Sequence, residues 1–483
     1  MPFTIHTQRH ARPMRAQSLL SRHHLRGAIS KIVVTFFLAA LMLHSMTCAG
    51  PSTRAQQSAL PAKKTDLPSP FALIHDSINA NNYLGPYLEL QERAAEYLAS
   101  PKRQRDYYDY LATMASFVGD YEADYQYEEK FLAALEPLTH LRRNFAHELT
   151  SSPIDKAHPR SALMTIASIA AEHQVIMINE EHRTPVHRAL TRQLLSVLYA
   201  KGFRYFAVET LEASDTDLNR RGYPVKKSGT YSVEPVFGDM LRTALRLGYK
   251  LVPYEYEQPC EPKPDNPIAC DDERERGQAQ NLVDRILRND PQAKILVHVG
   301  RGHNAKEKSE QFAFMAWYFK EISKLDPFAI DQVDMSERRN PADEHALYRY
   351  ITRKWQLTEP TVFQFDDGHF LKEGAYDLTI VTPRARYEQG RPTWLRMNGL
   401  RQPYSVNFKR LKLPVRAQQF DGREPLLLQA SLVGESADAV PVDQIIIYPG
   451  RQLPVLLLPK GKVRISAVDR AGKAVGQYET TIK

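Results

Sequence analysis

Residues 174–182 have the sequence QVIMINEEH, in which an apolar run ends directly in polar and ionisable side chains. A short apolar run of this kind is typical of a buried strand in a parallel sheet. Similar runs follow at residues 204–209, 250–254, 294–299 and 328–333. Stretches with apolar residues at helical spacing separate them, at residues 185–201, 236–247 and 274–288. This alternation predicts β-α-β units, and therefore an α/β fold with a mostly parallel sheet flanked by helices.

The sequence on either side of this region has a different pattern. Residues 70–165 carry apolar side chains at three- and four-residue spacing, which predicts a helical N-terminal segment that caps the next domain. We expect the α/β domain over residues 166–400. Residues 401–483 contain short alternating runs separated by turn residues, which predicts a small antiparallel, β-sandwich-like C-terminal domain.

Residues 1–47 are expected to be an export signal. They contain six Arg or Lys residues, no acidic residue, and an apolar run at 32–43 followed by small or polar residues. This run is too short for a membrane-spanning helix, which needs about 20 apolar residues. Residues 48–69 are expected to be a tether. Cys48 lies where a lipoprotein cysteine would lie, so the alternatives are a lipid-anchored protein of the cell envelope and a signal cleaved elsewhere.

Composition and charge exclude two classes of protein. The chain has 483 residues, 43% hydrophobic and 25% charged, which argues against a disordered or fibrous protein. Its formal net charge is +8, but most of the excess lies in the leader, and the rest is nearly neutral. A nucleic-acid-binding protein is expected to carry a basic face on its folded part. The expected partners are therefore a small-molecule ligand or substrate and, through a lipid anchor, the membrane.

Cys260 and Cys270 flank a proline-rich loop, and Cys48 is the third cysteine of the chain. In an exported protein this arrangement predicts a disulfide that closes the loop. The alternative is two unpaired thiols.

Polar side chains stand at the ends of four expected strands, where ligands of open parallel sheets bind. Glu180 and His182 are two residues apart, so in extended backbone they face the same side and can hydrogen-bond, whereas Glu181 points away. Glu209 follows an apolar strand and is expected to need a cationic partner, for which Arg274 is the candidate. The other polar groups at these ends are Tyr254, Glu255, His298, His303 and Asn304.

Taken in order, four motifs resemble the erythromycin esterase-like superfamily, which also holds the ChaN-like haem-uptake lipoproteins and the TraB/Tiki proteins. The motifs are Ile178-Asn179-Glu180-Glu181-His182 with His187, Ala207-Val208-Glu209, Arg274-Glu275-x-x-Gln278-Ala279-x-Asn281, and Gly300-Arg301-Gly302-His303-Asn304. The resemblance covers roughly residues 170–320. It implies one pocket lined by Glu180, His182, Glu209, Arg274 and His303.

This chain departs from the pattern of the superfamily at two positions. Asn179 stands where the motif has glycine, and Gln278 stands where it has methionine. Because asparagine restricts the backbone beside Glu180, we expect a changed pocket and do not carry over the activity of a relative.

The first of three functional hypotheses is an exported hydrolase of an ester, lactone or amide. Glu180 or His182 would act as general base on a water, Glu209 would orient it or hold charge, and Arg274 would fix the carboxylates. His303 would stabilise the oxyanion. In a variant of this hypothesis, His182, Glu209 and His303 hold a divalent metal ion that activates the water.

The second hypothesis is a ChaN-like lipoprotein that binds haem or another iron compound. Its axial ligand would come from His182, His187, His303 or Tyr254. The third is a non-catalytic scaffold in which the pocket is reduced to structural ion pairs. In the first two hypotheses the ligand would contact further polar groups, namely His187, Tyr254, Glu255, Asn281, His298 and Asn304.

Overall fold

The computed structural model describes residues 67–79, 81–135, 148–261 and 263–483. The expected signal at 1–47, Cys48 and nearly all of the expected tether lie outside the described residues. Within the described ranges, no helix combines the length and the apolar character needed to span a bilayer.

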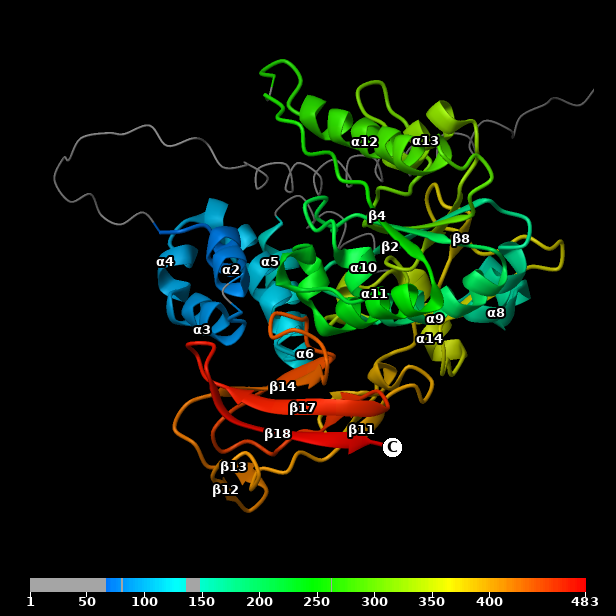
Figure 1. Ribbon diagram of the computed structural model, residues 1–483. Coiled ribbons are helices and arrows are strands. Elements are labelled where there is room, and N and C mark those ends of the chain that lie inside the picture. The colour runs from blue at the N-terminus through cyan, green and yellow to red at the C-terminus, as the bar shows by residue number, and fades with distance from the viewer. Residues whose placement is uncertain (1–66, 80, 136–147, 262) are drawn as a thin grey trace, which may run out of the picture. The chain divides into compact units, whose positions relative to one another are not determined.

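A six-stranded parallel sheet forms the centre of the α/β part (Figure 1). Its order is β4-β3-β5-β2-β6-β8, and each neighbouring pair is parallel. The strands are β2 (Val175–Glu180), β3 (Tyr205–Val208), β4 (Lys250–Pro253), β5 (Ile295–Gly300), β6 (Phe328–Asp331) and β8 (Leu378–Thr379). The predicted α/β class is therefore confirmed. The short edge strand β8 is one that the sequence analysis did not assign to this sheet.

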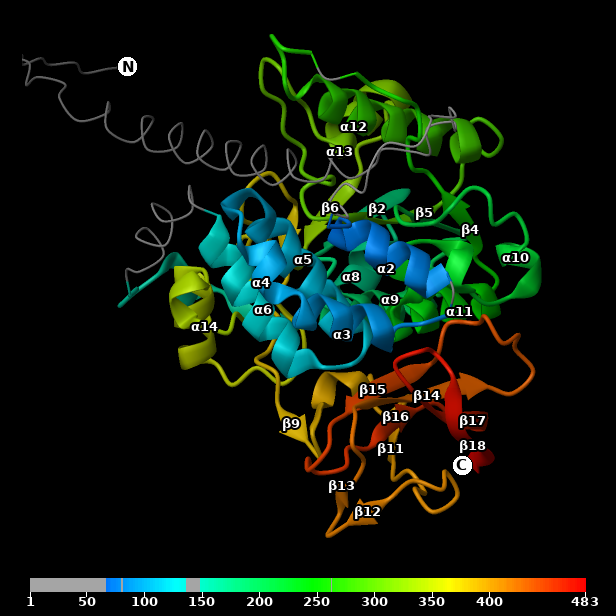
Figure 2. The same cartoon turned by 90° about the vertical axis from the view of Figure 1, so that its left-hand side faces the viewer.

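Both faces of the sheet are buried because alternate side chains enter opposite helical layers. Ile176 and Ile178 of β2 join one core cluster with residues of α8, α9 and α11, whereas Val175 and Met177 join another with residues of α12 and α13. Figure 2 shows α12 and α13 above the strands of the sheet and α8, α9 and α11 below them. The first layer holds α8 (Ala162–Ile169), α9 (Val186–Ala200) and α11 (Pro235–Leu247). The second holds α12 (Ala269–Leu282), which continues as the π-helical turn η5 (Val283–Leu287), and α13 (Met315–Ser323).

The strand order brings together the loops that follow β2, β3 and β5. β5 lies between β2 and β3, with Glu180 in register with Gly300 and Val208 in register with His298. After β2 the chain builds β3 and β4 on one side of that strand and later β6 and β8 on the other. Such a reversal of strand order opens a crevice at the carboxyl ends of the strands.

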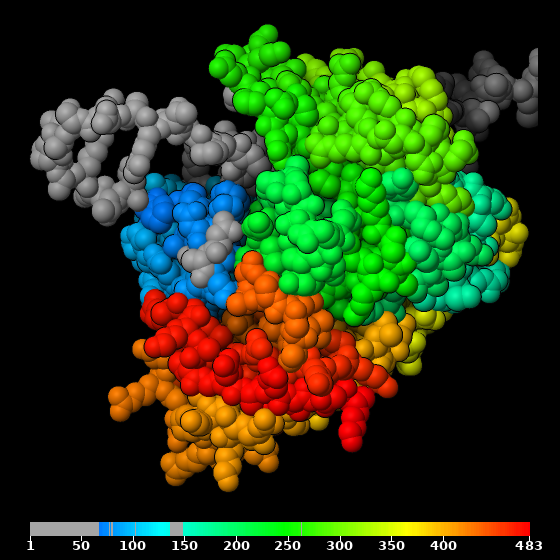
Figure 3. All heavy atoms as spheres, viewed as in Figure 1, coloured from blue at the N-terminus to red at the C-terminus, as the bar shows by residue number. Residues whose placement is uncertain are grey.

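The N-terminal segment is helical, as predicted. It comprises α2 (Pro70–Asn79), α3 (Leu84–Glu92), α4 (Ala94–Leu98), α5 (Pro101–Phe117) and α6 (Tyr121–Ala134). Its core cluster contains Tyr87 and Leu111, and it also takes in Val233 from the α/β part and Leu427 and Ile446 from the C-terminal part. These helices therefore pack against both of the other parts (Figure 3).

The C-terminal part is built of antiparallel sheets. Its four-stranded sheet has the order β15-β14-β17-β18. One face packs on the helical segment through Leu427, and the other faces a core that contains Leu428 and Leu456. The strands are β14 (Leu426–Leu432), β15 (Asp443–Ile447), β17 (Gly461–Val468) and β18 (Ala474–Ile482), with the pairs β11 (Gln402–Tyr404) to β16 (Leu456–Leu458) and β12 (Val415–Arg416) to β13 (Gln419–Phe420).

Several short elements complete the described chain. Two antiparallel pairs are β1 (His158–Ser161) with β7 (Thr361–Gln364) and β9 (Tyr387–Glu388) with β10 (Arg391–Pro392). The helices are α10 (Leu218–Arg221) and α14 (Ala346–Lys354), and the 3-10 turns are η2 (Pro153–Lys156), η3 (Lys226–Ser228), η4 (Tyr231–Val233), η6 (Pro341–Asp343) and η7 (Thr393–Arg396).

Candidate active site

Glu180 and His182 form a hydrogen-bonded pair at the end of β2. His182 Nδ1 lies 2.8 Å from Glu180 Oε1, as their spacing predicts. Arg188 of α9 donates from Nε to Glu180 Oε2 at 2.7 Å and from Nη2 to Oε1 at 2.9 Å. Burial raises the pKa of Glu180, but the charge of Arg188 and the hydrogen bond with His182 lower it more, so the pKa lies well below its ordinary value. Glu180 is therefore an anion, and His182 donates its Nδ1 proton to it.

Glu181 points to the other side of this loop, as expected. It pairs with Arg183 at 2.9 Å and lies 3.6 Å from Arg301 Nη1. The Glu181 backbone N–H donates to Nδ1 of His187, whose Nε2 lies 3.1 Å from Ser336 Oγ. Burial lowers the pKa of His187 to about 3. His187 is thus a neutral, buried residue that holds the loop in place.

Glu209, Arg274 and Glu255 form a salt-bridge network at the ends of β3 and β4. Arg274 Nη2 donates to Glu209 Oε1 at 2.8 Å and to Glu255 Oε2 at 2.7 Å, and its Nε donates to Glu255 Oε1 at 2.9 Å. Gln278, the residue in place of the motif methionine, donates to both oxygens of Glu255. Arg274 is therefore the partner that the desolvated Glu209 was predicted to need.

His303 lies between two carboxylates. Its Nδ1 is 2.5 Å from Glu275 Oε1, and its Nε2 is 3.3 Å from Glu209 Oε1 and 3.5 Å from Arg274 Nη1. The other oxygen of Glu275 accepts the backbone N–H of Met315 at 2.6 Å. Burial lowers the pKa of His303, but Glu209 and Glu275 raise it more, to about 9. His303 is therefore protonated at neutral pH.

Gly300, the last residue of β5, is where the two halves of the site meet. Its backbone N–H donates to Glu209 Oε2. A Cβ atom at this position would lie 2.9 Å from His182 Nε2 and 3.0 Å from Glu209 Oε2, so both atoms face the same point. The His182 ring also stacks on Tyr231, with 4.0 Å between ring centroids. A glycine is needed here because any side chain would displace the imidazole or the carboxylate.

Three of the other predicted ligand-binding residues donate to backbone carbonyls near the strand ends. The Tyr254 hydroxyl donates to the His298 carbonyl at 3.1 Å, and Asn281 donates to the carbonyls of Tyr254 and Glu255. Asn304 donates to the Ile330 carbonyl at 2.8 Å. Tyr254, His298 and Asn304 are buried. Their predicted contact with a ligand stays a prediction; in the structure these side chains hold the strand ends in position.

His298 is a neutral, buried residue beside Glu180. Its Nε2 lies 3.5 Å from Glu180 Oε2, and its ring packs edge-on against Phe237. Burial lowers the pKa of His298 to about 4, so the imidazole is neutral at physiological pH.

The structure corrects the expected metal site at His182, Glu209 and His303. Within the described residues, no group of three His, Cys, Asp or Glu side chains is arranged to hold a metal ion. Arg274 places its positive charge 2.8 Å from Glu209 Oε1 and 3.5 Å from His303 Nε2, and this charge opposes a cation at the same point. A guanidinium thus supplies the charge that a metal ion would bring.

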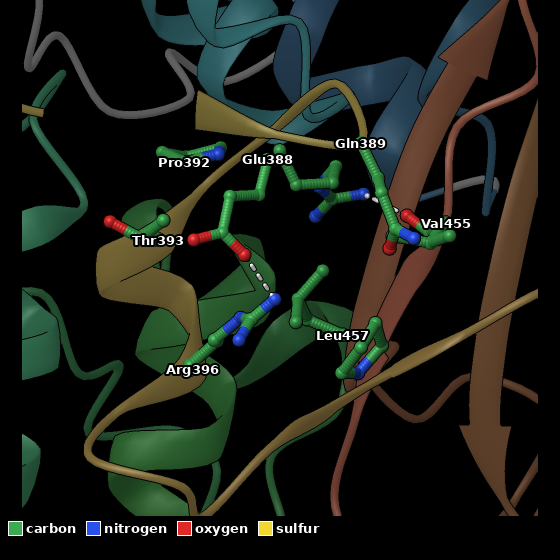
Figure 4. Close-up of a pocket in the computed structure, with 9 residues that line it drawn as sticks. Glu388, Gln389, Pro392, Thr393, Arg396, Val455 and Leu457 are labelled. Atoms are coloured by element: carbon green, nitrogen blue, oxygen red, sulfur yellow. Dashed lines mark hydrogen bonds and ion pairs between the residues drawn. The ribbon is translucent and has the colours of Figure 1, made fainter. Parts of the chain in front are cut away.

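Three of the four predicted haem ligands, His187, His303 and Tyr254, are buried and hydrogen-bonded. The fourth, His182, is 15% exposed, and haem binding stays a prediction. Two hollows lie away from these residues. One includes Glu388, Arg396 and Val455 in its lining (Figure 4), and the other, of about 480 Å³, lies over α8 and is lined by Met164 and His173 among others.

Asn179 does not disturb the backbone beside Glu180. Its Nδ2 donates to Asp331 Oδ1 at 2.8 Å, and its Oδ1 accepts the Gln332 N–H at 2.9 Å. Asn179 lies inside the regular strand β2 and is not among the described residues with positive φ. The expected effect on the pocket is therefore corrected: this side chain ties β2 to β6, and glycine's freedom is not needed here.

Cys260 and Cys270 form a disulfide. It closes the loop between β4 and α12, and these two elements position Glu255 and Arg274.

Sequence reasoning missed the roles of Arg188, Glu275 and Tyr231. Arg188 had a detectable signal, because Arg188, Thr191, Arg192 and Leu195 share the buried face of α9, where a charge must find a partner. Glu275 lay within a quoted motif but had no assigned role. Tyr231 follows no pattern that separates it from the other tyrosines.

Comparison with known proteins yields distant structural similarities only. No known family matches the chain, and no curated protein does. The type III effector HopBA1 shares 15% identity over 48% of this chain and 99% of its own, with a TM-score of 0.31. A structure described as bacterial protein toxins shares 13% identity over 57% of this chain and 68% of its own, with a TM-score of 0.30. RRSP, a MARTX toxin effector domain from Vibrio vulnificus CMCP6, shares 14% identity over 58% of this chain and 67% of its own, with a TM-score of 0.25. Similarities this weak assign no function.

Proposed function

We propose that this chain is a hydrolase of an ester, lactone or amide, and that His182 is its general base. The observation that carries the proposal is the meeting of His182 Nε2 and Glu209 Oε2 beside Gly300. A protonated histidine and an arginine adjoin the same carboxylate, so basic and cationic groups surround one small region.

The Glu180 carboxylate prepares His182 for this role. Because Glu180 is anionic and accepts the Nδ1 proton, Nε2, which faces Gly300, is the ring nitrogen that takes a proton from water. A carboxylate on one ring nitrogen fixes the tautomer and stabilises the imidazolium that forms when the other nitrogen takes a proton. Arg188 keeps Glu180 charged and in place.

The chemical step needs no covalent intermediate. Water attacks the carbonyl carbon as His182 Nε2 takes its proton, and Glu209 orients the water by accepting its second hydrogen bond. Negative charge then develops on the carbonyl oxygen, where protonated His303 and Arg274 can stabilise it. The intermediate collapses, and His182 returns the proton to the leaving alcohol or amine.

A panel of p-nitrophenyl acetate, γ-butyrolactone and p-nitroacetanilide tests the proposal with the purified full chain. We expect turnover of at least one, and a loss of about 10²-fold or more in His182→Ala, Glu209→Gln and His303→Gln. His158→Gln is the matched control, because His158 is an exposed histidine paired with Asp366, in a strand outside the central sheet. Absence of turnover by the wild type, or wild-type rates in all three variants, would show that the proposal is wrong.

We also propose that the chain acts outside the cytoplasm, anchored in the cell envelope, on a small-molecule substrate. The basic and apolar leader and the disulfide support this location, since disulfides persist in oxidising compartments. Cell fractionation tests the location, and radiolabelled palmitate that is incorporated by the wild type and not by Cys48→Ala tests the lipid anchor. Recovery of the unprocessed chain from the cytosol would refute both.

A further inference from the structure

The loop that carries His182 is held from its inner side by α9. Arg188 Nη2 donates to the His182 carbonyl at 2.6 Å, and His187 Nδ1 accepts the Glu181 N–H at 3.1 Å. The Thr184 N–H donates to the Glu181 carbonyl at 2.8 Å, which closes the turn. The inner contacts thus come from residues next to the loop in sequence.

On its outer side the same loop is held by the N-terminal helical segment, through Arg183. This side chain is 8% exposed, and its Nη2 lies 2.9 Å from Glu181 Oε1. Its Nη1 pairs with Asp109 of α5, and its guanidinium lies over the Phe131 ring of α6, 4.3 Å from the centroid. Arg183 therefore ties Glu181, the residue before His182, to α5 and α6, which are distant in sequence.

The charge of Arg183 makes this contact specific. Burial lowers the pKa of Arg183, but Glu181, Asp109 and Glu128 raise it more, so it stays charged. A buried guanidinium that loses one carboxylate partner is strongly destabilised and seeks another position. Neutralising Asp109 should therefore shift Arg183, and with it the loop from Glu181 to Thr184.

The ring of His182 has its own link to the helical segment. Tyr231, which stacks on His182, also packs against the core cluster formed mainly by α2, α3 and α5. The backbone and the ring of His182 thus depend on the same helices.

We infer that Asp109 is a positioning residue for His182, acting through Arg183, and that the helical segment completes the site instead of merely covering it. This inference rests on the proposed function for its kinetic consequence. Its structural part, the clamp on the loop, stands independently.

Asp109→Asn in the full chain tests the inference, with Asp106→Asn as control. Asp106 lies on the same helix and pairs with Arg105 at 3.2 Å, partly exposed to solvent. We expect Asp109→Asn to lower kcat about tenfold with KM little changed, because small displacements of a catalytic group are costly. Backbone amide exchange should accelerate in peptides covering residues 181–184, and Asp109→Glu should restore part of kcat.

One further variant and three possible outcomes keep the inference open to refutation. Arg183→Lys keeps the charge but cannot bridge Asp109 and Glu181 with two nitrogens, so it should behave like Asp109→Asn. If Asp109→Asn matches Asp106→Asn in exchange and in kcat, or if exchange rises evenly over α5 and α6, the inference fails. If the wild type hydrolyses nothing, the proposed function fails, and exchange at 181–184 still decides whether the clamp exists.

Discussion

Replacing Glu275 with glutamine should lower the pKa of His303. Glu275 is fully buried, and its Oε1 lies 2.5 Å from His303 Nδ1. Glutamine has the same shape and can still accept the Met315 N–H, so the packing should survive while the charge is lost. The pKa of His303 rises from 6.5 to about 9 in the native protein. At about 1.4 kcal/mol per pH unit, the surrounding charges favour the protonated form by about 3 kcal/mol after the cost of burial.

With Glu275 neutral, Glu209 is the carboxylate left beside His303. We expect the His303 pKa to fall by about one to two pH units, the usual effect of one nearby opposite charge. NMR titration of histidine-labelled protein measures this, with His303→Gln to assign the resonance. If protonated His303 serves the reaction, the alkaline limb of the pH–rate profile should move down by the same amount. An unchanged His303 pKa in Glu275→Gln would refute the electrostatic reasoning.

The same substitution predicts a change in the pH dependence of stability. Because the folded pKa of His303 is raised, its contribution to stability is fully present below about pH 6.5 and is lost as pH rises through about 9. The wild type should therefore lose about 3 kcal/mol of unfolding free energy from this group over that window. Urea unfolding at the two ends of the window should show a smaller loss in Glu275→Gln. An equal loss of unfolding free energy in the wild type and in Glu275→Gln would contradict the assignment of this pH dependence to His303 and Glu275.

Three further predictions test other parts of the structure. Gly300→Ala should lower kcat at least tenfold, because its Cβ would displace His182 and Glu209. A kcat equal to that of the wild type would show that the added Cβ does not crowd these side chains. Asn179→Gly should lower the unfolding free energy by about 2–3 kcal/mol in urea, since it leaves Asp331 and the Gln332 N–H without their partner; a more active or equally stable variant would show that asparagine is only a substitute for glycine. The double variant Cys260→Ser, Cys270→Ser should lose about 3 kcal/mol for a loop of ten residues, and intact mass without a shift on reduction would show that the disulfide is absent in solution.

Part of the site followed from the sequence because it depends on spacing within one strand exit. Glu180 and His182 are two residues apart at the end of an extended strand, so their pairing needs no knowledge of the rest of the fold. Glu209 needed a cation because it ends an apolar strand, and Arg274 is that cation. The predicted metal site has no matching group of ligands among the described residues, and the predicted haem site stays a prediction.

The sequence by itself determined the order and type of the elements, because helical and strand periodicities are local properties of the chain. It also determined that polar groups would gather at the carboxyl ends of the strands. Only the tertiary structure decided that β5 lies between β2 and β3, which sets Gly300 against both His182 and Glu209. The tertiary structure likewise pairs Glu275 with His303 and Asp109 with Arg183. A buried charge needs a partner of opposite charge, and only the fold decides which one lies near it.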